Sequence, residues 1–106
     1  MALKIEENSI QTEGLCSVVF DEDLTIYAIE ALKLELSKAI DSYKQFELNL
    51  ASVEEIDSAG IQLLLGLQRE ITRQEKGMKL TVMSAPVTKL IKMYGLVDSF
   101  NIGEAL

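Results

Sequence analysis

An aspartate-serine pair stands where an apolar alternation gives way to a helical pattern. Asp57-Ser58-Ala59-Gly60 follows the apolar segment from Phe46 to Leu50 and precedes a strongly apolar helical stretch. This order places the hydroxyl of Ser58 at a helix N-terminus, beside a carboxylate. A side-chain oxygen there usually accepts a free backbone N–H, so helix capping is one interpretation. The other is that Ser58 accepts a phosphate, because helix N-terminal N–H groups stabilise anions.

The surroundings of Ser58 indicate what such a phosphate would do. Glu54, Glu55 and Asp57 are close in sequence. A phosphate adds about −1.5 to −2 charges and would turn a small neutral surface into a strongly anionic one. Such a change breaks an interface more readily than it makes one, unless the partner carries arginines.

Catalytic chemistry has little support in the sequence. The chain contains no histidine, which removes Ser-His and Cys-His catalysis, histidine metal ligands and the commonest general base. An enzyme would need Lys76 or Lys79 to be brought to Ser58 by folding, because a nucleophile needs an activating neighbour. We find no glycine-rich phosphate loop and no metal-spaced cluster. We therefore predict no enzyme activity, no metal and no cofactor.

Composition limits the partners and the size of the fold. The chain has 106 residues and a net charge of −7, which suits one ordinary domain spanning residues 1–106. Acidity argues against nucleic acid and anionic membranes as partners, and it keeps a domain soluble. A basic patch on another protein is the better candidate. The chain shows neither a membrane-spanning apolar run nor a secretion signal, so a cytoplasmic location is expected.

The first part of the chain predicts a β-hairpin. Leu3, Ile5 and Ile10 alternate with polar residues, and Leu15 to Phe20 reads as a second strand after a turn at Glu13-Gly14. Cys16, the one cysteine, falls in this alternation and is expected to be a buried, inert thiol. We hypothesise that the exposed hairpin edge pairs two copies into a homodimer, which light scattering giving only monomer would reject.

A helical period begins at Thr25 and continues to Tyr43. Apolar residues recur there at three- and four-residue spacing, starting with Ile26, and Thr25 is placed to cap the helix. Phe46 to Leu50 predicts the third strand. A second helix is predicted from Ala59 to Lys76, ended by Gly77, with its apolar first half the more deeply buried.

The last third of the chain predicts another strand and helix. Leu80, Val82 and Met83 suit a fourth strand, Pro86 the first turn of a third helix, and Gly95 its end. Residues 97–102 are expected to form a short strand or coil. The order β-β-α-β-α-β-α predicts an α/β sheet with helices packed on it.

The central segment resembles a known family. Leu48-Asn49-Leu50-Ala51-Ser52-Val53-Glu54-Glu55-Ile56-Asp57-Ser58-Ala59-Gly60-Ile61-Gln62-Leu63-Leu64-Leu65 is similar to the signature of STAS domains of the bacterial anti-sigma factor antagonist type. The similarity continues through residues 76–80, 86–87 and 90–96, and it covers about Val18 to Phe100. It implies a mixed β-sheet of four to five strands flanked by three to four helices.

The resemblance also implies a function. Ser58 matches the serine that partner kinases phosphorylate in switchable members, and Asp57 matches the acid before it. In such members the unmodified domain binds an anti-sigma factor or related serine kinase of the ATP-binding kinase fold, and phosphorylation releases it. A metal-dependent serine phosphatase resets the domain. We expect the partner-binding surface to comprise Asp23, Asp57, Ser58, Ala59, Gly60 and Gln62.

The chain also departs from the commonest pattern. Residues 21–27 lack the glycine that many sporulation and stress members carry before the first helix, and they resemble a subgroup from chemotaxis and sensory clusters. The alternative function is therefore a constitutive, non-switching accessory subunit of a sensory assembly or of a lipid transporter. Ser52 and Ser84 each follow a strand, where hydrogen bonding to the backbone is a sufficient role for a serine.

Overall fold

The computed structural model describes residues 3–5, 14–20, 23–100 and 102. They form a four-stranded mixed sheet in the order β1-β2-β3-β4. The strands are β1 (Leu3–Ile5), β2 (Leu15–Phe20), β3 (Gln45–Leu50) and β4 (Gly77–Met83). β1 pairs antiparallel with β2, and the other two pairings are parallel. The predicted α/β class and mixed sheet are confirmed.

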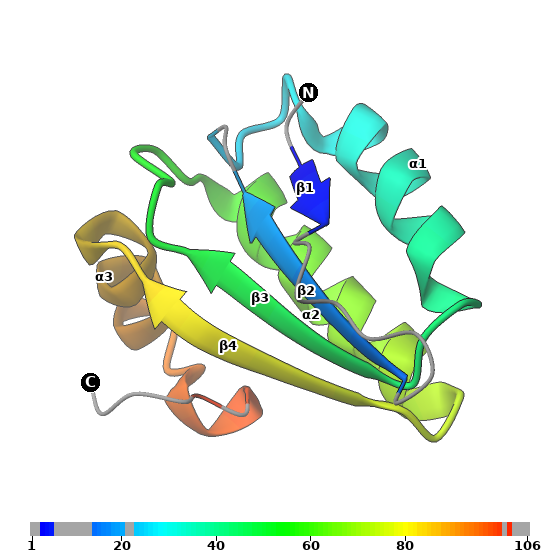
Figure 1. The fold of residues 1–106 in the computed structure, drawn as a ribbon. Helices are drawn as coiled ribbons and strands as arrows, with labels where there is room; N and C mark the ends of the chain where they lie inside the picture. Colours follow the sequence, from blue (N-terminus) through cyan, green and yellow to red (C-terminus); the bar gives the residue numbers. More distant parts are fainter. Residues whose placement is uncertain (1–2, 6–13, 21–22, 101, 103–106) are drawn as a thin grey trace.

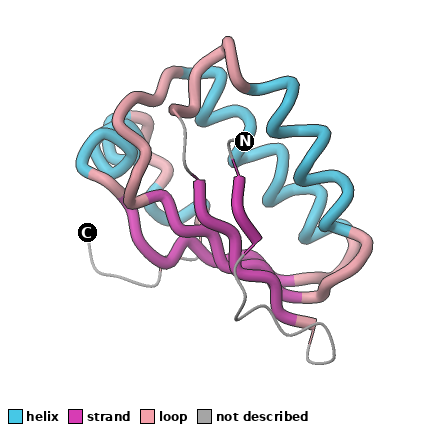
Figure 2. The backbone as a smooth tube through the Cα atoms, turned by 45° about the horizontal axis from the view of Figure 1, so that its top comes forward, coloured by secondary structure: helices cyan, strands magenta, loops and turns pink. Residues whose placement is uncertain are grey.

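The two long helices lie on one face of the sheet. They are α1 (Ile29–Ile40) and α2 (Ser58–Arg73), and a shorter helix, α3 (Ala85–Met93), follows β4. Figures 1 and 2 show α1 and α2 side by side on the same side of the strands, with α3 at the end of the sheet where β4 finishes. The connection from β2 to β3 contains α1, and the connection from β3 to β4 contains α2. Connections between parallel strands are right-handed, and both of these step across the sheet in the same direction. Both helices therefore lie on the same face.

The core lies between that face and the helices. Alternate residues of the parallel strands are buried there, among them Cys16, Val18, Leu48 and Leu80. The opposite face carries polar residues, and Glu47 lies beside Ser17 on one strand and Lys79 on the other. This alternation is expected for a sheet covered on one side only. The expected burial of Cys16 is confirmed.

The first helix begins later than its period predicts. α1 starts at Ile29 and its N-cap is Ala28, which makes no side-chain capping bond. Thr25 is therefore not the cap, and Ile26, which we expected on the inner face, is 65% exposed. The backbone N–H of Ile26 instead donates to the Asp57 carboxylate. The helix also ends at Ile40 and does not reach Tyr43.

The end of α2 corrects a second expectation. The helix ends at Arg73, and Glu75 adopts the left-handed conformation with φ 60°. Gly77 is the first residue of β4, paired with Gln45. A Cβ on Gly77 would lie 2.2 Å from the Gln45 side-chain oxygen, but this atom is the end of a flexible, exposed side chain that can move aside.

The ends of α3 match their predictions, whereas the segment after it, which we expected as a short strand or coil, begins with a 3-10 helix. Pro86 lies in the first turn of α3, and Gly95 follows the helix with φ 66°. Residues Val97–Ser99 form a 3-10 helix, and Ile102 makes a single bridge with Leu80. The expected strand at Ile10 and the turn residue Glu13 lie outside the described residues. β1 forms one edge of the sheet, and the homodimer proposed for it stays a prediction.

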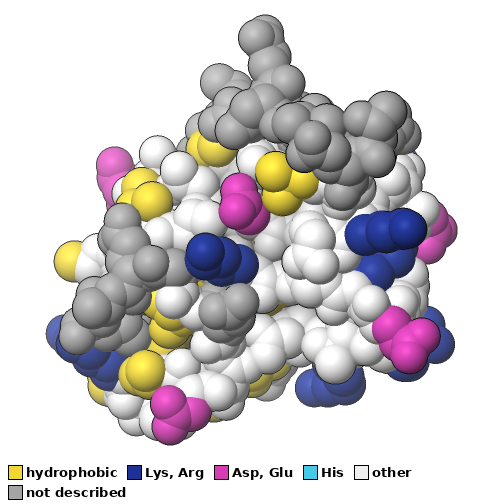
Figure 3. Space-filling view, turned by 60° about the horizontal axis from the view of Figure 1, so that its bottom comes forward, with side chains coloured by type: hydrophobic (Ala, Val, Ile, Leu, Met, Phe, Trp, Pro, Cys, Tyr) yellow, Lys and Arg dark blue, Asp and Glu magenta, His cyan; other side chains and the backbone are white. Residues whose placement is uncertain are grey.

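The distribution of charged side chains and the length of the helices concern two classes of partner, nucleic acids and membranes. On the face drawn in Figure 3, Lys and Arg side chains alternate with Asp and Glu around the edge and do not gather into a basic patch. Within the described part of the chain, no helix is both long enough and apolar enough to cross a membrane.

Candidate functional site

Two loops meet at the carboxyl end of the sheet, one before α1 and one before α2. Leu24 and Ile56 form a single parallel bridge between them. The N–H of Leu24 donates to the carbonyl of Glu55 at 2.9 Å, and the N–H of Asp57 donates to the carbonyl of Leu24 at 3.2 Å. The two loops are therefore joined by backbone hydrogen bonds, as adjacent strands are.

Asp23 strengthens this junction from the first loop. Its Oδ1 accepts hydrogen bonds from the backbone N–H groups of Glu54 at 3.1 Å and Glu55 at 3.0 Å. An ionised carboxylate makes stronger bonds to backbone donors than a neutral acceptor does. Asp23 thus holds the loop before α2 in place, and this acidic residue of the predicted site has a clear positioning role.

Asp57 connects both loops to the start of α2. Its Oδ1 accepts the N–H of Gly60 at 3.1 Å, which is the capping bond predicted for this junction. Its Oδ2 accepts the N–H of Ile26 at 3.1 Å, from the loop before α1. One carboxylate therefore caps α2 and fixes the neighbouring loop, and its charge suits the positive end of the helix dipole.

Ser58 is the first residue of α2 and is exposed. Asp57 takes the cap position, so the hydroxyl of Ser58 stands just inside the first turn. Glu54 and Glu55 are exposed on the preceding loop. The side chain of Ser58 is therefore open to solvent, and its backbone lies next to the Asp57 cap.

Gly60 allows the junction to close. The residue is buried, and a Cβ on it would lie 2.2 Å from the carbonyl oxygen of Leu24 and 2.8 Å from Cγ1 of Ile56. Only glycine permits this approach of helix and loop. Ala59 is half-buried, and Gln62 is exposed one turn after Ser58.

The structure brings all six predicted site residues to one end of the molecule. Asp23, Asp57 and Gly60 are engaged within the chain, whereas Ser58 and Gln62 face solvent. Ile26 and Tyr27, which were not predicted for the site, are 65% and 96% exposed beside this junction. The spacing of Ile26 continued the helical period, and nothing local showed that a distant carboxylate would hold its N–H outside the helix.

Comparison with known proteins identifies the family. A family model described as "Mlab, STAS domain" matches residues 11–102, which is most of the chain. The chain belongs to the STAS domain family. The resemblance drawn from the segment around Ser58 is thereby confirmed.

Solved structures share the fold of this STAS domain at low identity. The anti-sigma factor antagonist SpoIIAA in its unphosphorylated form is 22% identical, with a TM-score of 0.76 over 97% of this chain and 89% of that chain. The phosphorylated form of Bacillus SpoIIAA is 21% identical, with a TM-score of 0.71 over 97% of this chain and 92% of that one. An anti-sigma factor antagonist from Mycobacterium paratuberculosis is 19% identical, with a TM-score of 0.81 over 98% of this chain and 86% of that chain.

The site of this STAS domain presents the exposed side chains of Ser58 and Gln62 at the start of α2. Among the described residues, no three histidine, cysteine, aspartate or glutamate side chains are grouped so as to hold a metal ion. The hydroxyl of Ser58 has a carboxylate neighbour that is already occupied by two backbone N–H groups.

Proposed function

We propose that this STAS domain is a phosphorylation-switchable adaptor that binds another protein through the surface around Ser58. The observation that carries the proposal is an exposed serine in the first turn of a helix whose start is held by Asp57 and Asp23. A binding surface held in one conformation loses little entropy when a partner docks. Ser58 and Gln62 would contact the partner with part of Ala59, while Asp23, Asp57 and Gly60 would position them.

The partner in this proposal is an anti-sigma factor or related serine kinase of the ATP-binding kinase fold. A metal-dependent serine phosphatase would reset the switch, and the domain itself would be substrate and ligand, not an enzyme. The proposal is supported by the family match and by the similar fold of SpoIIAA, whose structure is known with and without phosphate. The chemotaxis-like residues before the first helix leave the cellular pathway of the partner open.

Electrostatics give the direction of the switch. A phosphate on Ser58 adds about −1.5 to −2 charges next to the carboxylate of Asp57 and near Glu54 and Glu55. The added group is also larger than the hydroxyl that a partner would accommodate. Phosphorylation is therefore expected to release the partner.

We expect Ser58→Asp to weaken partner binding at least about tenfold, which corresponds to about 1.4 kcal/mol, while Ser58→Ala binds nearly as the natural chain does. Aspartate introduces a charge at the position of the hydroxyl, whereas alanine removes only a small polar group. The measurement is calorimetric titration with a serine kinase of the ATP-binding kinase fold from the same genome, the class of partner in this proposal. Incubation with the same kinase and ATP should place phosphate on Ser58, as mapped by mass spectrometry.

Ser52→Asp is the matched control for added charge. Ser52 is exposed on the same loop as Glu54 but lies before the α2 junction. We expect Ser52→Asp to change the dissociation constant much less than Ser58→Asp. Equal affinities for the aspartate and alanine variants at Ser58, or an active kinase that leaves Ser58 unmodified, would contradict the switch.

The alternative function is a constitutive accessory subunit of a sensory assembly or a lipid transporter. It is favoured by the same fixed junction, because a permanent interface also needs a preorganised surface. Under this alternative, co-purification of the partner would be unchanged by Ser58→Asp. A transporter ATPase gene beside this one would point the same way.

A further inference from the structure

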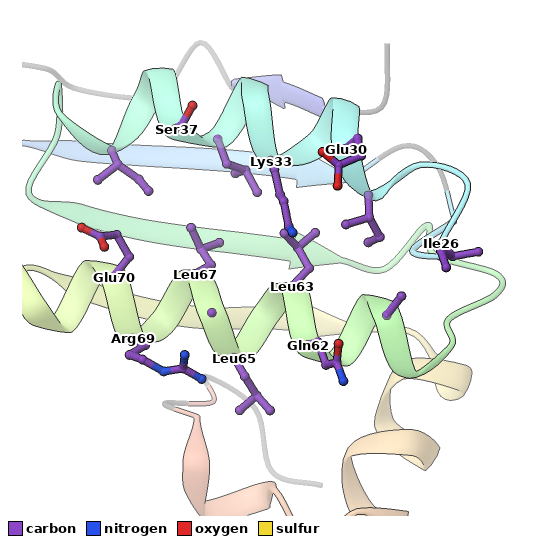
Figure 4. A pocket seen from close by; sticks show the side chains of 15 residues that line it. Ile26, Glu30, Lys33, Ser37, Gln62, Leu63, Leu65, Leu67, Arg69 and Glu70 are labelled. Atoms are coloured by element: carbon purple, nitrogen blue, oxygen red, sulfur yellow. The ribbon is translucent and has the colours of Figure 1, made fainter.

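Two neighbouring apolar side chains, Ile26 and Tyr27, are exposed on the loop before α1. Tyr27 is 96% exposed, more than any other large apolar side chain in the described part of the chain. Figure 4 looks into the groove between α1 and α2 and shows Ile26 at the end of this groove, on the loop, with its side chain directed away from both helices. Single exposed apolar residues are ordinary, whereas adjacent ones often mark a contact with another molecule.

The fold holds this pair outside the core. The N–H of Ile26 donates to Oδ2 of Asp57 at 3.1 Å, and Leu24, two residues earlier, is fully buried. α1 begins only at Ile29, and its N-cap Ala28 makes no side-chain capping bond. The apolar spacing of the sequence favours a helix that starts earlier and buries Ile26. A local preference that the folded chain overrides is expected at a functional surface.

Asp57 connects this pair to Ser58. Its Oδ1 accepts the N–H of Gly60 in the first turn of α2, and its Oδ2 accepts the N–H of Ile26. The same carboxylate therefore binds a backbone group near Ser58 and the residue next to Tyr27. A specific protein interface covers about 800 Å² on each partner. A protein surface that covers Ser58 reaches Ile26 and Tyr27 as well.

The charges around the pair are predominantly acidic. The two loops, residues 23–28 and 51–57, contain no lysine or arginine, and they carry four acidic residues: Asp23, Glu54, Glu55 and Asp57. In the first two turns of α1, Glu30 and Lys33 offset each other, and Figure 4 shows Lys33 directed toward α2. α2 carries no charged side chain before Arg69. The complementary surface is therefore apolar at its centre and basic around it.

We propose that Tyr27, together with Ile26, is the apolar anchor of the partner interface and enters an apolar pocket with a basic rim on the kinase-fold partner. The inference rests on the proposed adaptor function, because it assigns a second contact to the same partner. Tyrosine is among the residues that contribute most of the binding energy at protein interfaces. The anchor does not use the Ser58 hydroxyl, so its loss can be separated from loss of the switch.

The test compares variants of the full chain in calorimetric titrations with a serine kinase of the ATP-binding kinase fold from the same genome. We expect Tyr27→Ala to weaken binding about tenfold or more, because a few central contacts dominate such interfaces. Tyr27→Phe keeps the ring and should bind nearly as the natural chain does. Tyr94→Ala and Met93→Ala are the matched controls, because they remove exposed side chains at the end of α3. Figures 1 and 2 show α3 and α1 on opposite sides of the molecule, so both controls should keep the natural affinity.

Thermal unfolding shows whether a variant has lost affinity through misfolding. The side chain of Tyr27 lies almost wholly in solvent, so Tyr27→Ala should leave the unfolding midpoint unchanged. Raised salt should slow association with the kinase, because it screens the attraction between the acidic loops and the basic rim. An association rate that does not depend on salt would contradict the basic rim.

Four further results would overturn the anchor. Natural affinity in Tyr27→Ala, together with lost affinity in Ser58→Asp, would reject it and leave the adaptor function standing. A loss as large in Tyr27→Phe or in Tyr94→Ala would reject an apolar contact specific to Tyr27. If the natural chain does not bind the kinase at all, both proposals fail. If the natural chain self-associates and Tyr27→Ala abolishes only that, the occupant is a second copy and the proposal is wrong.

Discussion

Gly60→Ala should lower the free energy of unfolding by about 3 kcal/mol, the upper part of the range for overpacked sites. The new Cβ would lie 2.2 Å from the Leu24 carbonyl oxygen and 2.8 Å from the Leu24 Cβ. A carbonyl in a backbone bridge cannot rotate away as a long side chain can. The clash would therefore separate α2 from the loop before α1, and urea denaturation would measure the loss.

Gly66→Ala is the matched control, because it makes the same change six residues later in the same helix. A Cβ on Gly66 would meet no atom within 4 Å, so the change brings only the better helix propensity of alanine. We expect the free energy of unfolding to rise by about 0.5–1 kcal/mol. The two substitutions should thus have opposite signs. A loss of similar size at both positions would show that the contact with Leu24 is not what makes Gly60 necessary.

Asp57→Ala should lower the free energy of unfolding by about 2–3 kcal/mol, because it removes a helix cap and a second charge-assisted bond. Oδ1 and Oδ2 serve different elements, the N–H of Gly60 in α2 and the N–H of Ile26 in the other loop. Asp57→Asn keeps one oxygen and should retain the cap, so about half of the loss is expected. Urea denaturation of both variants would measure the difference.

Glu54→Ala is the control for removing an acid from this region. The side chain of Glu54 is exposed, and its backbone N–H would still donate to Asp23. We expect its effect on the free energy of unfolding to stay within about 0.5 kcal/mol. If Asp57→Ala changed the free energy of unfolding by as little as Glu54→Ala, the prediction would be wrong. Water would then replace the two hydrogen bonds of Asp57 at little cost.

Substitutions at Gly60 and Asp57 can also distinguish an effect on folding stability from an effect on partner binding. Gly60 and Asp57 act on the position of Ser58 from inside the chain, whereas Ser58 and Gln62 face solvent. An Asp57→Asn protein that remains folded but binds its partner more weakly would show that the exact position of the α2 start matters to recognition. Natural affinity in this variant would mean that capping by a single oxygen is enough.

The spacing of residues was enough to predict the order of the strands and helices, most of the buried face of the two long helices, and the serine at a helix start. These features depend on the spacing of apolar residues and on short capping patterns, which are local. Asp57 and Ser58 could be placed for that reason, as could Pro86 and Gly95 at the ends of α3.

The features that join distant segments became visible only in the folded chain. Asp57 holds the N–H of Ile26 across 31 residues, so an apolar residue with helical spacing lies outside the helix and in solvent. Gly77 looked like a helix stop, but strand pairing with Gln45 makes it the start of β4. The contrast between Gly60 and Gly66 is of the same kind: the residue type is identical, and only the neighbours brought by folding distinguish a required contact from an open groove.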